Sequence, residues 1–123
     1  MKVLLSIKPE YAESILSGKK KYEFRKSIFR NKNVDTIVIY ATMPVGKVIG
    51  EFKVGDILAL SPSELWDKTK AHAGITHSFF KDYFHQREKA FAISIKNPKR
   101  YKFPVDLNEL IPGGVAPQSY RYL

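Results

Sequence analysis

Apolar residues of this chain come in short runs that are rich in β-branched side chains and are interrupted by proline, glycine or asparagine. Such runs predict buried or half-buried β-strands. The clearest run covers residues 36–42, Thr-Ile-Val-Ile-Tyr-Ala-Thr, and ends just before Pro44. Further strands are predicted at residues 3–7, 20–26, 48–54, 57–60 and 91–95. Asn97-Pro98 is expected to mark a turn, and residues 117–123 are expected to be extended or to form a final strand. This pattern favours a fold built on a sheet of short strands.

Three helices are predicted between the strands from their end signals. Pro9 suits a first helical position and Gly18 the residue after a helix end, so a helix is expected over residues 9–17. Ser61 opens a capping box, and Thr76 is expected to cap a third helix. This irregular mixture of strands and helices predicts the α+β class, here a small, mostly antiparallel barrel with flanking helices.

Charge is spread unevenly over the 123 residues, a length that predicts one domain spanning 1–123. The formal net charge is +9 and the pI is about 9.7. Residues 1–35 and 68–123 carry +5 and +6, whereas residues 36–67 carry −2. Clustered basic charge is typical of proteins that bind nucleic acid. The alternative is a basic surface that serves only solubility.

The composition excludes several classes of protein. There is no cysteine, which excludes a disulfide scaffold, a thiol nucleophile and a cysteine-ligated metal site. No apolar run approaches the roughly 18–20 residues that span a bilayer, and the first residues are too polar for a signal peptide. The three histidines lack ligand spacing, so no metal and no cofactor are expected. We therefore expect a cytoplasmic protein without membrane association.

The densest feature is the segment 18–26, Gly-Lys-Lys-Lys-Tyr-Glu-Phe-Arg-Lys, which contains a single acid within a basic run. Alternation places Tyr22 and Phe24 on one face of the predicted strand and Glu23 and Arg25 on the other. The two aromatic residues are expected to be in the core. Glu23 and Arg25 are close enough to touch each other or to bind one ligand together.

This run resembles the signature of the ASCH domain, a branch of the PUA-like superfamily. Gly18, Lys20, Glu23 and Arg25 match its Gly-x-Lys-x-x-Glu-x-Arg pattern. Three further stretches are similar to one group in the family, in the same order along the chain: residues 5–9, residues 39–52 and residues 117–119. The resemblance implies a PUA-like pseudobarrel of five to six short strands around a cleft, which in the family is thought to receive RNA or a nucleotide.

On this interpretation the chain binds RNA or a nucleotide, with single-stranded nucleic acid as the expected partner, in a basic cleft. Phosphate or sugar contacts are expected from four basic residues, Lys8, Lys20, Arg25 and Lys26. Glu23 is expected to accept a hydrogen bond from a base or sugar. The remaining expected site residues are Tyr40 or Trp66 for base stacking, Thr42 at a strand end, and Gln118 and Ser119 at one side of the cleft.

Two other functions remain open at the level of sequence. Some relatives are hydrolases; one group deacetylates acetylated cytidine with a lysine, a threonine and a glutamate, and another is described as cleaving RNA. Lys20 matches that lysine, Glu23 stands at the threonine position, and residues 66–73 contain no matching glutamate. As an enzyme, the chain would use Lys20 and Glu23 as a metal-independent acid and base pair. A protein-interaction module is the third function, although no dedicated feature supports it.

Overall fold

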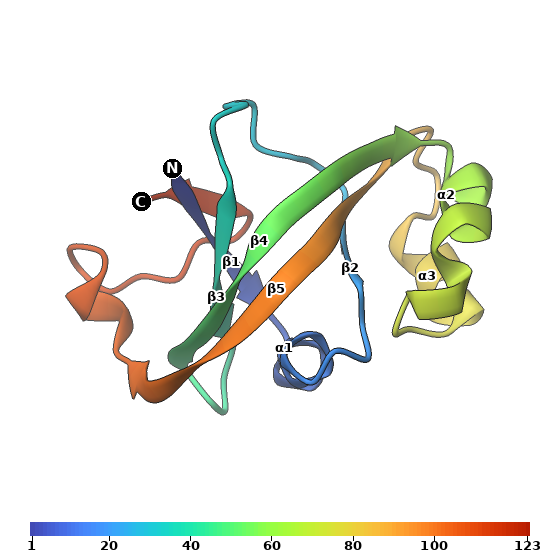
Figure 1. Ribbon diagram of the computed structural model, residues 1–123. Helices are drawn as coiled ribbons and strands as arrows, with labels where there is room; N and C mark the ends of the chain where they lie inside the picture. The colour runs from blue at the N-terminus through green and yellow to red at the C-terminus, as the bar shows by residue number, and fades with distance from the viewer.

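Six strands form one mixed sheet in the order β2-β5-β4-β3-β1-β6. The computed structural model describes residues 1–123 (Figure 1). Its strands are β1 (Lys2–Ile7), β2 (Tyr22–Arg25), β3 (Thr36–Ala41), β4 (Lys47–Leu60), β5 (Ala90–Val105) and β6 (Tyr120–Tyr122). Only the β1–β3 pair is parallel. The sheet curves into a half-barrel with flanking helices, which confirms the predicted mostly antiparallel α+β fold.

Three α-helices and two short 3₁₀ turns flank this sheet. They are α1 (Pro9–Leu16), α2 (Pro62–Thr69), η1 (Lys70–His72), α3 (His77–Tyr83) and η2 (Leu107–Glu109). The side chains of Ser61 and Thr76 accept hydrogen bonds from the third backbone N–H that follows them, so the predicted caps of α2 and α3 are confirmed. In Figure 1, α1 lies below the sheet and the α2–α3 pair covers its right-hand end. None of these helices has the length and apolar character needed to cross a membrane.

Strands β4 and β5 are longer than predicted. The residues that were expected to form turns lie at β-bulges inside these strands. Residues 48–54 and 57–60 belong to one strand, β4, whose register with β5 shifts between Val54 and Ile57. The predicted turn at Asn97-Pro98 also lies inside a strand, β5. There the register shifts again, and Asn97 takes a φ of 48°. An extra residue bends a strand without ending it, so both predicted breaks were wrong.

Strands β1 and β3 bury both of their faces, which explains their continuous apolar sequence. Alternate residues enter two separate clusters. The cluster on the α1 side includes Val3, Leu5, Ile37, Ile39 and Phe52, and the opposite cluster includes Leu4, Val38, Tyr40, Leu107 and Ile111. A third cluster lies under α2 and α3 and is built largely from Phe24, Leu65, Phe80, Phe84 and Ala92. The short edge strand β2 therefore lies at the border between the sheet core and the helical end of the molecule.

Candidate functional site

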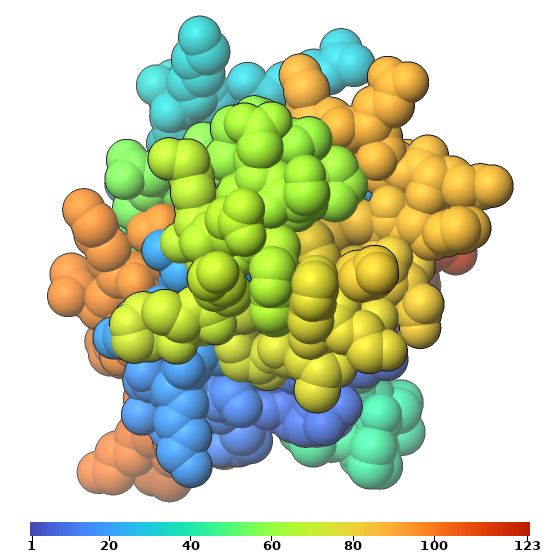
Figure 2. All heavy atoms as spheres, turned by 90° about the vertical axis from the view of Figure 1, so that its right-hand side faces the viewer, coloured from blue at the N-terminus to red at the C-terminus, as the bar shows by residue number.

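A cavity of about 210 Å³ opens between α1, β2 and α3. Figure 2 shows that end of the molecule, with the α2–α3 region in the centre and the α1 segment below it. Eleven residues line the cavity: Ser6, Ile7, Lys8, Tyr11, Lys20, Glu23, Phe24, Arg25, Ile75, Phe79 and Tyr83. We call it the β2 pocket. It is large enough for one ring system or one sugar, and its walls combine aromatic rings with charged groups.

Lys20 lies in the wall of the β2 pocket and is only 2% exposed. Its Nζ donates a hydrogen bond of 2.7 Å to the carbonyl oxygen of Ala73 and lies 4.8 Å from the centre of the Phe24 ring and 5.4 Å from that of Tyr11. Burial lowers the pKa of the Lys20 ammonium to about 8, and the neighbouring Glu23 carboxylate opposes that shift only in part. Near neutral pH this lysine can therefore both carry a charge and exchange a proton.

Gly74 lets the chain pass closely over Lys20. Its φ is +70°, which favours glycine, and a Cβ at this position would lie 2.6 Å from Cγ of Lys20. The backbone N–H of Lys21 also donates a 3.0 Å hydrogen bond to the carbonyl oxygen of His72. The segment 72–74 is thus the roof that removes Lys20 from water.

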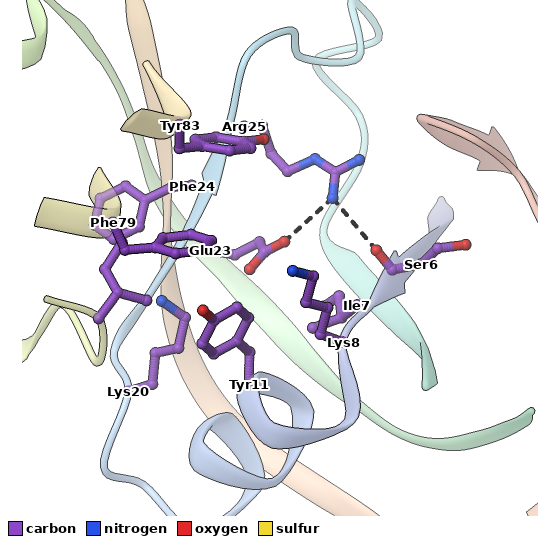
Figure 3. A pocket seen from close by; sticks show the side chains of 11 residues that line it. Ser6, Ile7, Lys8, Tyr11, Lys20, Glu23, Phe24, Arg25, Phe79 and Tyr83 are labelled. Atoms are coloured by element: carbon purple, nitrogen blue, oxygen red, sulfur yellow. Dashed lines mark hydrogen bonds and ion pairs between the residues drawn. The ribbon is translucent and has the colours of Figure 1, made fainter. Parts of the chain in front are cut away.

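Glu23 is the second buried charged residue, with 6% of its surface exposed. Its Oε2 accepts a 3.2 Å hydrogen bond from Nη1 of Arg25. Burial raises the pKa of the Glu23 carboxyl, while Arg25 and Lys20 act in the opposite direction. Figure 3 shows the Glu23 carboxylate and the Lys20 ammonium pointing into the same space, with the Tyr11 hydroxyl drawn between them. Such a pair can act as proton donor and acceptor toward one ligand.

Arg25 connects the β2 pocket to the C-terminal segment. Besides Glu23, it donates hydrogen bonds to the carbonyl oxygens of Ser6, at 3.5 Å, and Ser119, at 2.7 Å. Ser6 in turn donates from its hydroxyl to the carbonyl oxygen of Pro117 at 2.8 Å. The Arg25 guanidinium is therefore largely engaged by the protein, and its main visible task is to hold Glu23 and the neighbouring strands in place.

Two rings of α3 form the outer wall of the β2 pocket. Phe79 and Tyr83 are one helical turn apart, with ring centres separated by 6.4 Å and planes at 10°. Nζ of Lys8 lies 5.5 Å from the Phe79 ring centre, and Nζ of Lys26 lies 4.8 Å from that of Tyr83. Both lysines are exposed. A ring wall flanked by two exposed cations offers stacking and phosphate contacts side by side.

The structure gathers part of the predicted site. Lys8, Lys20, Glu23 and Arg25 all line the β2 pocket, and Lys26 lies at its rim over Tyr83. Ser119 reaches the site through its carbonyl oxygen, which accepts from Arg25.

Four predicted residues lie elsewhere. Tyr40 is buried in the cluster with Leu107, because alternation along β3 turns its side chain to the opposite face of the sheet. Thr42 belongs to the turn after β3, where its carbonyl oxygen accepts from Val45. The Trp66 ring stacks on His77 at 4.6 Å, and the exposed Gln118 does not line the pocket.

Sequence reasoning missed the wall supplied by the helices. Tyr11, Phe79 and Tyr83 were not among the predicted site residues, yet they line the pocket. The available signal was that α3 carries two aromatic pairs. Phe80 and Phe84 are nearly fully buried, so Phe79 and Tyr83 have to face in another direction.

The curved mixed sheet, with a buried lysine and a buried glutamate facing a pocket at its β2 edge, places the chain in a class of small α+β domains. The sequence profile described as the ASCH domain matches residues 5–99. The chain therefore belongs to the ASCH domain family.

Relatives in this family include a protein of Zymomonas mobilis named ASCH domain-containing ribonuclease. It is 35% identical over 107 residues, which are 87% of this chain and 72% of the relative. The crystal structure of ASCH from Zymomonas mobilis has a TM-score of 0.92 and 33% identity, over 99% of this chain and 87% of that one. The large ribosomal subunit protein uL22 of Ureaplasma parvum is 28% identical over 98% of this chain, which spans only 39% of that longer protein.

Proposed function

We propose that the β2 pocket binds one nucleotide unit of single-stranded RNA, and that residues 1–123 do so as one domain. The observation that carries the proposal is the pocket itself, where Lys20 and Glu23, both buried, face a cavity of about 210 Å³ walled by aromatic rings. Burying two charged side chains is costly for folding, and buried ionisable groups that face a cleft are candidates for a functional site. The Zymomonas mobilis relative named as a ribonuclease supports RNA as the ligand.

The position of each group supports a division of tasks. Lys8 and Lys26 lie on either side of the Phe79–Tyr83 wall, where they are free to contact phosphates before and after the bound nucleotide. The rings of Tyr11 and Phe79 offer faces and edges for a base or sugar, as in other single-strand binders. An unpaired nucleotide enters such a pocket more readily than one in a duplex, since no base pair has to be broken.

Salt-dependent binding tests this assignment. Fluorescence anisotropy with a labelled single-stranded RNA should give a steep fall of affinity with salt. Lys8→Ala and Lys26→Ala should each reduce the log–log slope by about 0.7, the value of one phosphate contact on a single strand. Lys99→Ala is the matched control, because Lys99 is exposed and does not line the pocket. An equal effect of all three substitutions would contradict the placement of the strand.

RNA cleavage is the second candidate function, and the presence of Lys20 and Glu23 in the wall of one pocket favours it. A ribose 2′-hydroxyl can attack the adjacent phosphorus, with the P–O5′ bond breaking to leave a cyclic phosphate and a 5′-hydroxyl. That reaction needs a base for the attacking hydroxyl, an acid for the leaving oxygen and a cation for the phosphate. With a pKa of about 8, Lys20 is suited to proton transfer or to charge stabilisation, and Glu23 supplies the complementary group.

A cleavage assay separates binding from catalysis. A labelled single-stranded RNA, with and without chelator, is compared with the same strand carrying 2′-deoxyribose throughout. Cleavage should require the 2′-hydroxyl, and Glu23→Gln should lower its rate by about 10²–10⁴-fold while binding persists. Glu88→Gln, at an exposed glutamate outside the pocket, should have no effect. Acetylated cytidine serves as an alternative substrate: product from it alone would assign the pocket to deacetylation rather than to RNA cleavage.

A further inference from the structure

The Lys20 amine lacks the partners that a permanently charged buried lysine needs. No carboxylate oxygen lies within 4.0 Å of Nζ, since Lys20 takes part in none of the ion pairs of the structure. Its one hydrogen bond runs to the carbonyl oxygen of Ala73. An ammonium has three N–H donors, so the remaining donor positions face rings and the cavity. Because no carboxylate is in contact with Nζ, a neutral amine, with two N–H groups and a lone pair, is also accommodated in these surroundings.

The same amine is accessible from inside the cavity. Lys20 lines the β2 pocket together with Glu23, while its stem is covered by Gly74 and Ala73. With a pKa of about 8, roughly a tenth of the Lys20 side chains are neutral at pH 7, compared with less than about a thousandth for an exposed lysine. Desolvation in an apolar pocket is one way in which a protein activates a lysine toward carbonyl compounds.

We propose that Lys20 forms an imine with an aldehyde held in the β2 pocket, the aldehyde being the ring-opened C1′ carbonyl of an abasic nucleotide in a single strand. The choice of a nucleotide as carrier rests on the proposed function, because Lys8 and Lys26 are the groups that would hold the phosphates on either side. The imine chemistry itself rests only on the cavity and on the surroundings of Nζ.

The step balances without any further reactant. The Nζ lone pair attacks the C1′ carbonyl carbon, and a proton moves from nitrogen to oxygen to give a carbinolamine. The C1′–OH bond then breaks as the hydroxyl takes a proton, water leaves and the C=N bond forms as an iminium. The iminium becomes the imine when its N–H proton passes to the carboxylate that supplied the first proton. The Glu23 carboxyl faces the same space and can supply the first proton, and burial favours its protonated form. No oxidation or reduction occurs until a reductant is added from outside.

Reductive trapping tests the proposal on the intact protein. A fluorescent oligonucleotide with one abasic site is incubated with the protein and sodium cyanoborohydride, which converts an imine into a stable secondary amine, and adducts are separated on a denaturing gel. Lys20→Met should reduce the adduct at least about tenfold, in line with the loss of the reacting amine. Lys21→Met is the matched control, because Lys21 is the exposed neighbour in the chain and should leave the adduct unchanged. Equal adduct from both variants would overturn the proposal.

A second measurement uses only the unsubstituted protein, so it does not depend on how a variant folds. Acetaldehyde and cyanoborohydride are added at pH 7, and mass spectrometry of peptides compares early ethylation of Lys20 and Lys21. Lys20 should react at least about tenfold faster, because burial lowers the pKa of its ammonium to about 8 and so raises the share of neutral, nucleophilic amine. Slower or equal reaction at Lys20 would overturn the imine chemistry, whether or not RNA binds. Fast ethylation without an oligonucleotide adduct would retain that chemistry and overturn the abasic nucleotide as its source.

Discussion

The sheet core and the β2 pocket differ in what they bury: the core buries apolar side chains, whereas the pocket buries charged ones. Both faces of β1 and β3 are filled by apolar side chains, and Phe52 at the centre of the larger cluster is 1% exposed. The β2 pocket, at the edge of the same sheet, contains the two buried charged residues of the molecule, Lys20 and Glu23. Burial of apolar side chains in the core increases the free energy of unfolding, whereas the removal of Lys20 and Glu23 from water decreases it. Substitutions on the two sides should therefore affect stability and ligand binding in opposite proportions.

The largest effect on stability is expected in the sheet core. Phe52→Ala removes a fully buried ring and should lower the free energy of unfolding by about 3–5 kcal/mol, from lost transfer energy plus the cavity left behind. Urea unfolding followed by circular dichroism measures this change. RNA affinity of the remaining folded protein should be unaltered, and a loss of affinity per folded molecule would show that the two sides are not independent.

The buried lysine should make stability depend on pH with an unusual sign. The pKa of Lys20 is lower in the folded chain, at about 8, than in the unfolded chain, so the unfolded state binds more protons between these values. Stability should therefore rise between pH 8 and 10.5 relative to Lys20→Met, by up to about 3 kcal/mol. Unfolding titrations of both proteins across this range test it. A constant difference between them would mean that Lys20 titrates as an exposed lysine does.

Arg25 is expected to contribute both to the stability of the fold and to the geometry of the β2 pocket. Its bonds to Glu23 and to the carbonyl oxygens of Ser6 and Ser119 need the planar guanidinium fork, which lysine lacks. Arg25→Lys should cost about 1.5–3 kcal/mol of stability, the range for hydrogen bonds to a charged group. Arg100→Lys is the control, because Arg100 makes an exposed bidentate pair with Glu13 that should be worth about 0–1 kcal/mol. Equal losses of stability in the two variants would mean that the bonds of Arg25 stabilise the fold no more than an exposed ion pair does.

The smallest expected effect is the difference between alanine substitutions at two glycines, Gly18 and Gly74, which both have a left-handed backbone conformation. Gly18 and Gly74 have φ values of +84° and +70°, but a Cβ at Gly18 would meet nothing within 4 Å, whereas one at Gly74 would press on Lys20. Each change to alanine should cost about 1–2 kcal/mol from backbone strain alone. Gly74→Ala should in addition weaken RNA binding or slow the ethylation of Lys20, measured as above. No difference between the two variants would argue against the roof over Lys20.

The sequence predicted the sheet core better than it predicted the β2 pocket. The strands of the core were predictable because β-branched runs and alternation depend on nearest neighbours in the chain. Alternation along β2 placed Glu23 and Arg25 on one face, where they could touch each other or bind one ligand together, and the structure shows that they touch, at 3.2 Å. The same alternation misled at that strand, since Glu23 is buried beside Phe24 although it points the other way. Both faces of β2 are covered by other parts of the chain, and the alternation of residues within β2 does not indicate that its second face is also buried.

The residues that were misplaced depend on contacts far apart in the sequence. Tyr40 stands at a strand end, but the segment that covers its face, around Leu107, follows more than sixty residues later. The wall formed by Phe79 and Tyr83 exists because α3 packs next to α1, as the edge contact between Tyr11 and Phe79 shows. Neither arrangement follows from local propensity or periodicity, which specify elements and not how they pack.

The place of β2 at the outer edge of the sheet has a consequence for aggregation. Exposed strand edges invite pairing with other chains, and proteins limit this with short or charged edge strands. The two edges here are β2, with four residues, and β6, with three. Glu23 and Arg25 alternate with aromatic residues along β2, so the charges that form the pocket also interrupt what would be an apolar template for β-assembly. Glu23 and Arg25 therefore belong both to the lining of the candidate site and to the charged pattern that protects this edge against intermolecular strand addition.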